Sequence, residues 1–320
     1  MRIFFQPTTD PAFNLAVEEY LLYHTDEDCL MLWQNDKSII VGKNQNTAAE
    51  INRAFVTEHQ IPVIRRLTGG GAVFHDLGNL NYTFIRRHAR DSFNDFALFS
   101  KPVIEVLRSL GVPATLSGRN DLLADGKKFS GNAQVAYGDS VLHHGTLLFS
   151  SDMSMLSKAL NVHPLKVKSK GVASVRSRVT NLCEYTDCTP KSFAKLLFDR
   201  FQDGDNRPLS DAEIIAVENI KKERYDTWEW NYGTRLPYQI QNTAYLSAGL
   251  VTAEVSVADN RISAVRISGD FFGQREITEL EEKLTGVLYQ DEALKVVLDS
   301  LPLNEYIVGA TPLDLLSILL

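Results

Sequence analysis

The spacing of apolar residues changes repeatedly along the chain between the helical and the strand period. In the first part it predicts, in order, a helix that begins at Asp10 or Pro11 and passes Tyr20, strands at 30–33 and 38–42, a helix from 47 to about 59, a strand into Arg65, a strand over 80–85 and a helix over 93–110. Thr47 and Glu50 have the spacing of a capping box. Pro11 suits a first helical position, and Pro102 is expected to mark the first turn of the main part of its helix.

The later part of the chain predicts a separate small unit. Helical patterns at 190–201 and 211–224 precede a domain boundary that we expect near 235–247. Beyond it we expect a hairpin formed by 250–258 and 261–267, then helices over 276–288 and 291–301. A chain of 320 residues exceeds the size at which one core keeps growing. We therefore divide the chain into residues 1–243 and 244–320.

Residues 65–84, RRLTGGGAVFHDLGNLNYTF, carry the strongest chemical signal. Three consecutive glycines can approach a ligand closely, and Arg65 and Arg66 supply guanidinium groups that suit carboxylates and phosphates. The stretch predicts a loop that wraps an anionic ligand, or else a flexible turn with its arginines in solvent. The usual phosphate-binding patterns, G-x-x-x-x-G-K-[ST] and G-x-G-x-x-G before a helix, are absent. A nucleotide bound here would be held by a loop between strands.

Two further segments carry polar residues on predicted strands. In residues 120–133, Asp125 and Gly126 predict a two-residue hairpin turn. Side chains alternate along a strand, so Lys128 rather than Lys127 should face the same side as Ser130. Residues 143–149 read as a strand in which a small residue, glycine at 145, lets another group approach.

Together these motifs resemble those of bacterial lipoate–protein ligases that have a C-terminal accessory domain. The matching segments are 65–79, 120–133, 143–148, 170–182 and the WEWNYG run at 228–233, and the resemblance spans residue 14 to residues 269–271. It implies an α+β fold with a class II synthetase/biotin ligase-like catalytic domain of mixed sheets flanked by helices, plus a small α+β accessory domain. It also implies ATP-dependent activation of lipoic acid to lipoyl-adenylate. The lipoyl group then passes to a lysine of apo lipoyl domains, in 2-oxoacid dehydrogenase E2 subunits or glycine cleavage H protein.

The resemblance also implies roles for particular residues. Lys128 would be catalytic, contacting both the lipoate carboxyl group and the phosphate, and residues 170–178 would close over the adenylate. The residues implied to contact the nucleotide and the acyl chain are Arg66, Gly71, Ala72, Val73 and Phe74. Further binding candidates from the same motifs are Gly70, His75, Asn79, Asp121, Gly131, Ala133, His144, Gly145, Lys170, Gly171 and Val172. Thr68 stands where the family more often has serine.

The chemistry of this reaction agrees with these residue types. A carboxylate that attacks the α-phosphate of ATP brings two anions together, and Arg66 and Lys128 supply the positive charge. Charge-assisted hydrogen bonds of this kind contribute about 1.5–3 kcal/mol each. Magnesium is expected with the phosphates, and Asp121 is the candidate carboxylate ligand. Alternatively, Asp121 is a turn residue that bonds its own backbone. Transfer to a substrate lysine requires no enzyme nucleophile, so we expect no covalent acyl-enzyme.

Other polar residues leave alternatives open. His75 and Asp76 suggest a turn whose side chains bond the backbone rather than a metal dyad. His143 and His144 should point to opposite faces of one strand, where one of them either lines the acyl site or lies in the core or at its rim. Asn79 and Asn81 share a strand face and either orient the glycines or mark an exposed face. The basic segment 166–178 suggests phosphate contact and steering of an acidic acceptor, or a solvated loop.

Rival functions need features that the sequence lacks. An octanoyl or lipoyl transferase that acts through a cysteine thioester needs an activated thiol, and neither Cys183 nor Cys188 has a neighbouring histidine. A biotin ligase would have a different glycine motif. A lipoyl-domain binding protein without catalysis is disfavoured because Arg66, Lys128 and the three glycines are intact.

Composition limits the partners and the cellular compartment that we expect. The net charge of −7, with both signs interspersed, argues against a nucleic-acid binder. There is neither an apolar stretch long enough to span a membrane nor a signal peptide, so we expect a cytoplasmic protein without membrane contact. The three cysteines form no metal or disulfide framework. We expect a monomer, because an enzyme with its own accessory domain can work as one.

Overall fold

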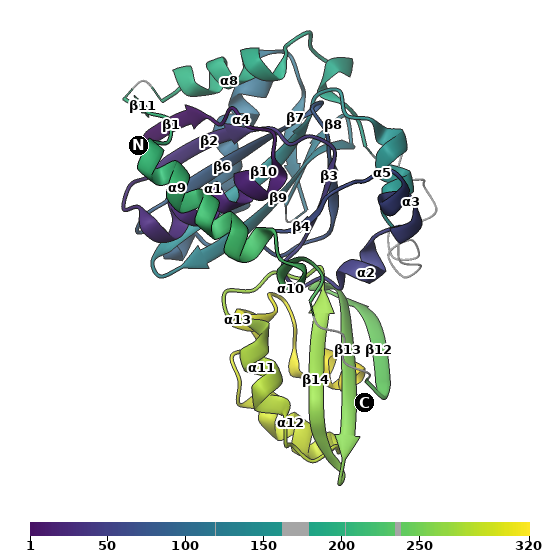
Figure 1. Cartoon of the computed structure of the whole chain (residues 1–320). Helices are drawn as coiled ribbons and strands as arrows, with labels where there is room; N and C mark the ends of the chain where they lie inside the picture. The colour runs from purple at the N-terminus through teal and green to yellow at the C-terminus, as the bar shows by residue number, and fades with distance from the viewer. Residues whose placement is uncertain (119, 162–178, 202, 234–237) are drawn as a thin grey trace.

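The computed structural model describes residues 1–118, 120–161, 179–201, 203–233 and 238–320. These residues form a large N-terminal domain and a smaller C-terminal domain that lies below it in Figure 1. The predicted α+β class, with mixed sheets flanked by helices and a small accessory unit, is confirmed. None of the described helices is long and apolar enough to cross a membrane.

The large domain is built on an eight-stranded sheet of order β11-β1-β2-β6-β10-β9-β8-β7. Its strands are β1 Arg2–Phe5, β2 Cys29–Trp33, β6 Asn79–Arg86, β7 Ala114–Ser117, β8 Asp121–Ala124, β9 Lys127–Tyr137, β10 Ser140–Leu148 and β11 Asp205–Asn206. A three-stranded sheet of order β4-β3-β5 consists of β3 Ser38–Val41, β4 Val63–Arg65 and β5 Val73–His75. The glycine loop, residues 68–72, therefore joins two strands of the small sheet, as the sequence predicted.

Helices cover both faces of the large sheet (Figure 1). Successive side chains of β2 alternate between two cores, which explains its uninterrupted apolar run: Leu30 packs in the core beside α4 and α8, and Met31 packs in the core beside α1. The helices of this domain are α1 Pro11–His24, α2 Thr47–Glu50, α3 Arg53–Glu58, α4 Phe96–Ser109, α5 Met153–Ala159, α8 Pro190–Asp199, α9 Asp211–Ile220 and α10 Trp228–Asn231. Single turns of 3₁₀ helix occur at Arg90–Ser92 and Leu182–Glu184, and a π-helical turn at Lys221–Tyr225 follows α9.

The small domain has a core of its own between a sheet and helices. Its antiparallel sheet has the order β12-β13-β14, with β12 Ile240–Leu246, β13 Gly249–Ala258 and β14 Arg261–Gly269. Its helices are α11 Ile277–Leu284, α12 Asp291–Asp299, α13 Leu303–Tyr306 and α14 Pro312–Leu319. The predicted hairpin is present, whereas β12 was not predicted. The division drawn between residues 243 and 244 falls inside that strand.

Some local predictions are confirmed and others are wrong. Asp10 caps α1 as expected, by accepting from the amides of Ala12 and Phe13. Asp125 and Gly126 both have positive φ, as a type I′ hairpin turn requires. The predicted helix from 47 to 59 is instead two short helices. Its capping box does not form, because the Thr47 hydroxyl donates to the carbonyl of Asn231, in α10.

The break between α2 and α3 has a tertiary cause. Ile51 is extended and forms an antiparallel bridge with Leu160, so the backbone leaves the helical conformation there. Pro102 was also misplaced, because α4 begins six residues earlier at Phe96. The Asp95 side chain caps that earlier start by accepting from the amide of Leu98, and the proline lies inside the helix.

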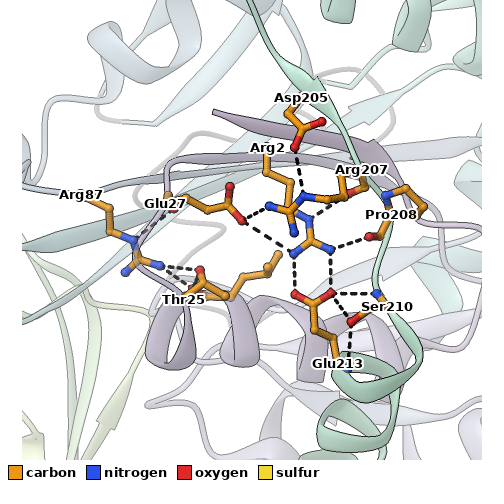
Figure 2. A network of polar contacts seen from close by, with 10 residues as sticks. Arg2, Thr25, Glu27, Arg87, Asp205, Arg207, Pro208, Ser210 and Glu213 are labelled. Carbon is orange, nitrogen blue, oxygen red and sulfur yellow. Dashed lines mark hydrogen bonds and ion pairs between the residues drawn. The ribbon is translucent and has the colours of Figure 1, made fainter.

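A buried arginine at the N-terminus, which the sequence analysis missed, ties β1 to α9 (Figure 2). The Arg2 side chain is fully buried, and its Nη1 and Nη2 donate to the two carboxylate oxygens of Glu213 at 2.6 and 3.0 Å. Its remaining bonds go to the carbonyl groups of Arg207 and Pro208. The bidentate pair joins residues 211 positions apart and thereby fixes the edge of the large sheet.

This pair predicts an acid-dependent contribution to stability. The hydrogen bond from Arg2 lowers the pKa of Glu213 from 4.5 to about 2. A depressed carboxyl pKa stabilises the fold above the unfolded-state value, and this stabilisation is lost as pH falls toward 2. Glu213→Gln should lower Tm at pH 7, and the difference from wild type should shrink between pH 5 and pH 2. Thermal denaturation followed by circular dichroism measures this, with the exposed Glu218→Gln as the control. A Tm difference that stays constant over this range would contradict the account.

Candidate active site

Two adjoining cavities lie beside the glycine loop. The first has a volume of about 140 Å³ and includes apolar walls from Leu15, Trp33 and Ile40. The second, of about 310 Å³, is more apolar and includes Phe74, Leu148 and residues of α5. The residues that line both cavities are Gly71, Ala72, Val73, Lys128, Gly131 and Thr146. A ligand with one part in each cavity would therefore pass directly beside Lys128.

The Arg66 guanidinium organises the glycine loop. It is buried, and its Nη2 donates to the carbonyl groups of Gly69 and Gly71 at 2.7 and 2.9 Å. Nη1 donates to the carbonyl of Ile40, and Nε to the hydroxyl of Thr68. Burial lowers the pKa of Arg66 to about 10, so the group is still charged at pH 7. Four of its five N–H donors are used in this way, which leaves one for a ligand in the first cavity.

A chain of hydrogen bonds continues from Arg66 to a buried carboxylate. His144 Nδ1 lies 2.9 Å from Glu18 Oε1, and His144 Nε2 lies 2.8 Å from Thr68 Oγ1. A carboxylate only accepts, so Nδ1 carries a proton, and in the neutral ring Nε2 accepts from the Thr68 hydroxyl. That hydroxyl in turn accepts from Arg66. Glu18, which also accepts from the Thr83 hydroxyl, thus supplies the negative charge nearest to this network.

Lys128 lies where the sequence places it: it lines the second cavity together with Ser130, and Lys127 does not. The β8–β9 register shifts at a bulge, so Leu122 pairs with Ser130 and Leu123 pairs with Lys128. The Lys128 ammonium lies over Gly131, where an added Cβ would approach it to 3.1 Å. Lys127 is exposed.

The candidate metal ligand pairs with Lys128. Asp121 Oδ1 lies 2.7 Å from Lys128 Nζ, and about a third of each side chain is exposed. Within the part of the chain that the structure describes, the Asp121 carboxylate accepts no backbone hydrogen bond, which disfavours the alternative that it bonds its own backbone. Among the described residues, no three His, Cys, Asp or Glu side chains come together as a metal-binding group.

Most predicted binding residues line the cavities. In the first cavity these are Arg66, Gly70, Gly71, Ala72, Val73, His75, Lys128, Gly131, Ala133, His144 and Gly145. Phe74 lines the second cavity, whereas Asn79 and Asp121 line neither. Lys170, Gly171 and Val172, and the rest of the predicted closing loop, lie outside the described residues. Residues that sequence reasoning did not assign to the site include Leu15, Trp33, Ile40, Asn81, Asn120, Asn132 and Thr146.

The two histidines of β10 point to opposite faces, as predicted. His144 lines the first cavity, whereas the His143 ring stacks on Phe99 in the core, and burial holds its pKa well below the usual value. Gly145 leaves room for Asn132 and Tyr82, since an added Cβ would overlap both side chains. The close approach predicted at Gly145 is thus made by protein side chains.

Two other polar predictions are revised, one of them in part. We expected the side chains of His75 and Asp76 to bond the backbone. Asp76 does so, because it accepts from the amides of Gly78 and Asp152. His75 instead bonds the side chain of Asn35, and burial lowers its pKa to about 3. Asn79 and Asn81 are buried rather than exposed, and they bond each other.

The C-terminal domain contacts the glycine loop directly. Gly70 N donates to the carbonyl of Phe271 at 3.3 Å, and a Cβ added to Gly69 would overlap the same carbonyl. Gly70 has a φ of +92°, which glycine adopts without strain, and a Cβ there would approach the Phe272 ring to 3.2 Å. One wall of the site therefore depends on both domains.

The sequence of both domains matches that of known lipoate–protein ligases. Residues 10–202 match the family model for the lipoyl protein ligase A/B catalytic domain, and residues 236–319 match the model for the bacterial lipoate protein ligase C-terminus. The chain belongs to the lipoate–protein ligase family of enzymes, as its motifs suggested. It is 42% identical to the lipoate-protein ligase LplJ of Bacillus subtilis, over 98% of both chains.

Solved structures agree with this assignment. LipL1 of P. falciparum, crystallised with lipoate, is 26% identical, with a TM-score of 0.77 over 94% of both chains. A lipoate-protein ligase A bound with ATP is 27% identical, with a TM-score of 0.65 over 72% of this chain and 98% of that one. A bipartite ligase from Thermoplasma acidophilum, described with its E2 lipoyl domain, is 27% identical, with a TM-score of 0.67 over 75% of this chain and 98% of that one.

The hydrogen-bond chain through Thr68 gives a prediction with a matched control. Thr68→Val keeps the shape of the side chain but leaves Arg66 Nε and His144 Nε2 without their partner. It should lower the free energy of unfolding by about 1–3 kcal/mol and reduce ligase activity about 10- to 100-fold, because Arg66 is no longer fixed. Thr68→Ser keeps the hydroxyl and should stay near wild type in both. Urea denaturation and initial rates measure the two effects, and equal activity in both variants would contradict the role of the hydroxyl.

Proposed function

We propose that this enzyme activates lipoate with ATP to lipoyl-adenylate and then transfers the lipoyl group to a lysine of an apo lipoyl domain. Lipoate would occupy the first cavity and the nucleotide the second. The observation that carries this proposal is the position of Lys128 on the wall common to both cavities. The lipoate and the ATP in the two related structures support the same pair of ligands here.

The first step joins two anions, and the charges of the site suit it. A carboxylate oxygen of lipoate attacks the α-phosphorus, and the bond to pyrophosphate breaks. Lys128 can contact the carboxylate and the phosphate together, and Arg66 has one N–H donor left for the same region. Fixed cations in a partly buried site stabilise the charge of the transition state without reorganisation.

Magnesium is proposed to accompany the phosphates. The carboxylate of Asp121 is the candidate ligand, because it is partly exposed and lies within 2.7 Å of Lys128 Nζ. One carboxylate together with phosphate oxygens and water is the coordination that Mg²⁺ commonly has in nucleotide sites. When bound, the ion would neutralise phosphate charge and orient the pyrophosphate that leaves.

The second step needs no enzyme nucleophile. The acceptor lysine, as the free amine, attacks the acyl carbon of the adenylate, AMP leaves, and the nitrogen loses a proton. We propose lipoyl domains of 2-oxoacid dehydrogenase E2 subunits and of glycine cleavage H protein as acceptors, and the E2 lipoyl domain described with the Thermoplasma acidophilum ligase supports the first of these. We propose that the enzyme acts as a monomer.

The cysteine environments argue against a thioester mechanism. Burial raises the pKa of Cys29 to about 12 and also raises that of Cys188, so neither is an activated thiolate. Cys183 is exposed on the 3₁₀ turn Leu182–Glu184. Neither Cys183 nor Cys188 lines either of the two cavities.

The adjacent lysines provide the first test. Lys128→Ala should reduce lipoate-dependent pyrophosphate release by about 100-fold or more, because a fixed cation is lost from the reacting groups. Lys127→Ala, which changes the exposed neighbour on the same strand, should stay within about twofold. The measurement is a coupled pyrophosphate assay with ATP, Mg²⁺ and lipoate. Unchanged release in Lys128→Ala would refute the role proposed for this residue.

The cysteine variants provide a second test. Cys183→Ala and Cys188→Ala should each retain full transfer of the lipoyl group to an acceptor domain, because no step passes through a thiol. Acceptor lipoylation measured by mass spectrometry gives the result. Loss of transfer in either variant, with pyrophosphate release intact, would favour the thioester route.

A further inference from the structure

Arg65 lies next to Arg66 but lines neither cavity. Its side chain is buried and makes hydrogen bonds only with carbonyl and hydroxyl oxygens among the described residues. Nη1 donates to the carbonyl groups of Gly42, Lys43 and Gln45, at 2.9, 2.8 and 2.7 Å. Nη2 donates to the hydroxyl of Thr47 and the carbonyl of Asn231, at 2.6 and 3.1 Å, and Nε donates to the carbonyl of Trp230 at 2.8 Å.

The 228–233 motif also holds the backbone of Arg65. Trp230 Nε1 donates to the Arg65 carbonyl at 2.8 Å, and Arg65 N donates to Asn231 Oδ1 at 2.9 Å. Asn231 in turn donates to the carbonyl of Tyr225, and its own carbonyl accepts from Thr47. Neither Trp230 nor Asn231 lines a cavity, so contact with a ligand does not explain these hydrogen bonds.

Residues 42–47, which Arg65 holds, pack on the glycine loop. A Cβ added to Gly42 would overlap the carbonyl oxygen of Gly70, and Lys43 N donates to the carbonyl of Thr68 at 2.9 Å. The same segment leads into α2, which ends at Glu50 on the wall of the second cavity. The position of Arg65 therefore sets the position of the glycine loop and of one wall of the second cavity.

We propose that Arg65, held by Trp230 and Asn231, is a positioning residue for the adenylation step. It acts through residues 42–47 on the glycine loop and α2, and it touches neither lipoate nor ATP. The expected effect on the rate of adenylation rests on the proposed function. The expected effect on the conformation of the glycine loop does not depend on any activity.

The geometry explains why a guanidinium is required. Arginine presents five donors in a planar fork, and here they reach six oxygens from six residues: five backbone carbonyl groups and the Thr47 hydroxyl. A lysine ammonium has three donors at a single point, so it keeps the charge and loses the fork. A residue needed only for its charge would tolerate lysine, and a positioning residue would not.

The test compares Arg65→Lys with Arg65→Met, at a temperature where circular dichroism shows both variants to be folded. Both should slow lipoate-dependent pyrophosphate release by about 10- to 100-fold and raise KM for ATP. Lipoate affinity, measured by calorimetry, should fall by a smaller factor than the adenylation rate, because the glycine loop is only one wall of the first cavity and the opposite walls at Leu15, Trp33 and Ala133 are not held by Arg65. The control is Arg224→Lys, at the face of the Trp230 ring, which should stay within about twofold of wild type in every measurement.

Hydrogen exchange provides the independent readout. Peptides that cover residues 41–47 and 66–72 should exchange at least about fivefold faster in Arg65→Lys than in wild type, because the bonds that fix them are lost. Unchanged exchange would overturn the inference whether or not the enzyme is active. Activity of Arg65→Lys within about threefold of wild type, or a fall in lipoate affinity as large as the fall in adenylation rate, would overturn it as well. Absence of pyrophosphate release from the wild type would instead contradict the proposed function.

Discussion

The burial of positive charge at the end of β4 is the constraint on which the site depends. Arg65 and Arg66 are both buried, and both direct their donors mainly to backbone carbonyl groups rather than to acids. A buried guanidinium needs many acceptors, so the backbone of two loops folds around these two side chains. Arg66 shapes the glycine loop from the cavity side, and Arg65 holds the segment on which that loop packs. Hydrogen bonds from the two cations thus hold both the glycine loop and the segment on which it packs.

The C-terminal domain is part of the same arrangement. The Phe271 carbonyl and the Phe272 ring lie against the glycine loop, and Gly269 N donates to the carbonyl of Asn44, within the segment that Arg65 holds. An ion pair between Lys43 and Glu276 adds a further contact between the domains. The accessory domain therefore contacts the glycine loop, which lines both cavities, and a change in the position of the domain would alter those contacts.

Sequence reasoning succeeded where the signal is local. The glycine loop, the Asp125 turn and the start of α1 follow from the conformational preferences of a few adjacent residues. It failed where a distant partner decides. Glu18 lies 126 positions from His144, so nothing local identified it as the carboxylate of the site. The helix predicted after Thr47 is interrupted because Thr47 is bonded to Asn231 and Ile51 to Leu160. Asp121 has the residue type of a metal ligand, and its ion pair with Lys128 comes from the pairing of β8 with β9.

The central claim is that one enzyme uses ATP to attach lipoate to a protein lysine. The most direct test is the intact mass of a purified apo lipoyl domain after incubation with the enzyme and lipoate, with and without ATP and Mg²⁺. The account predicts a gain of one lipoyl group only when ATP and Mg²⁺ are present. A gain without ATP, or no gain with several acceptor domains in its presence, would contradict it.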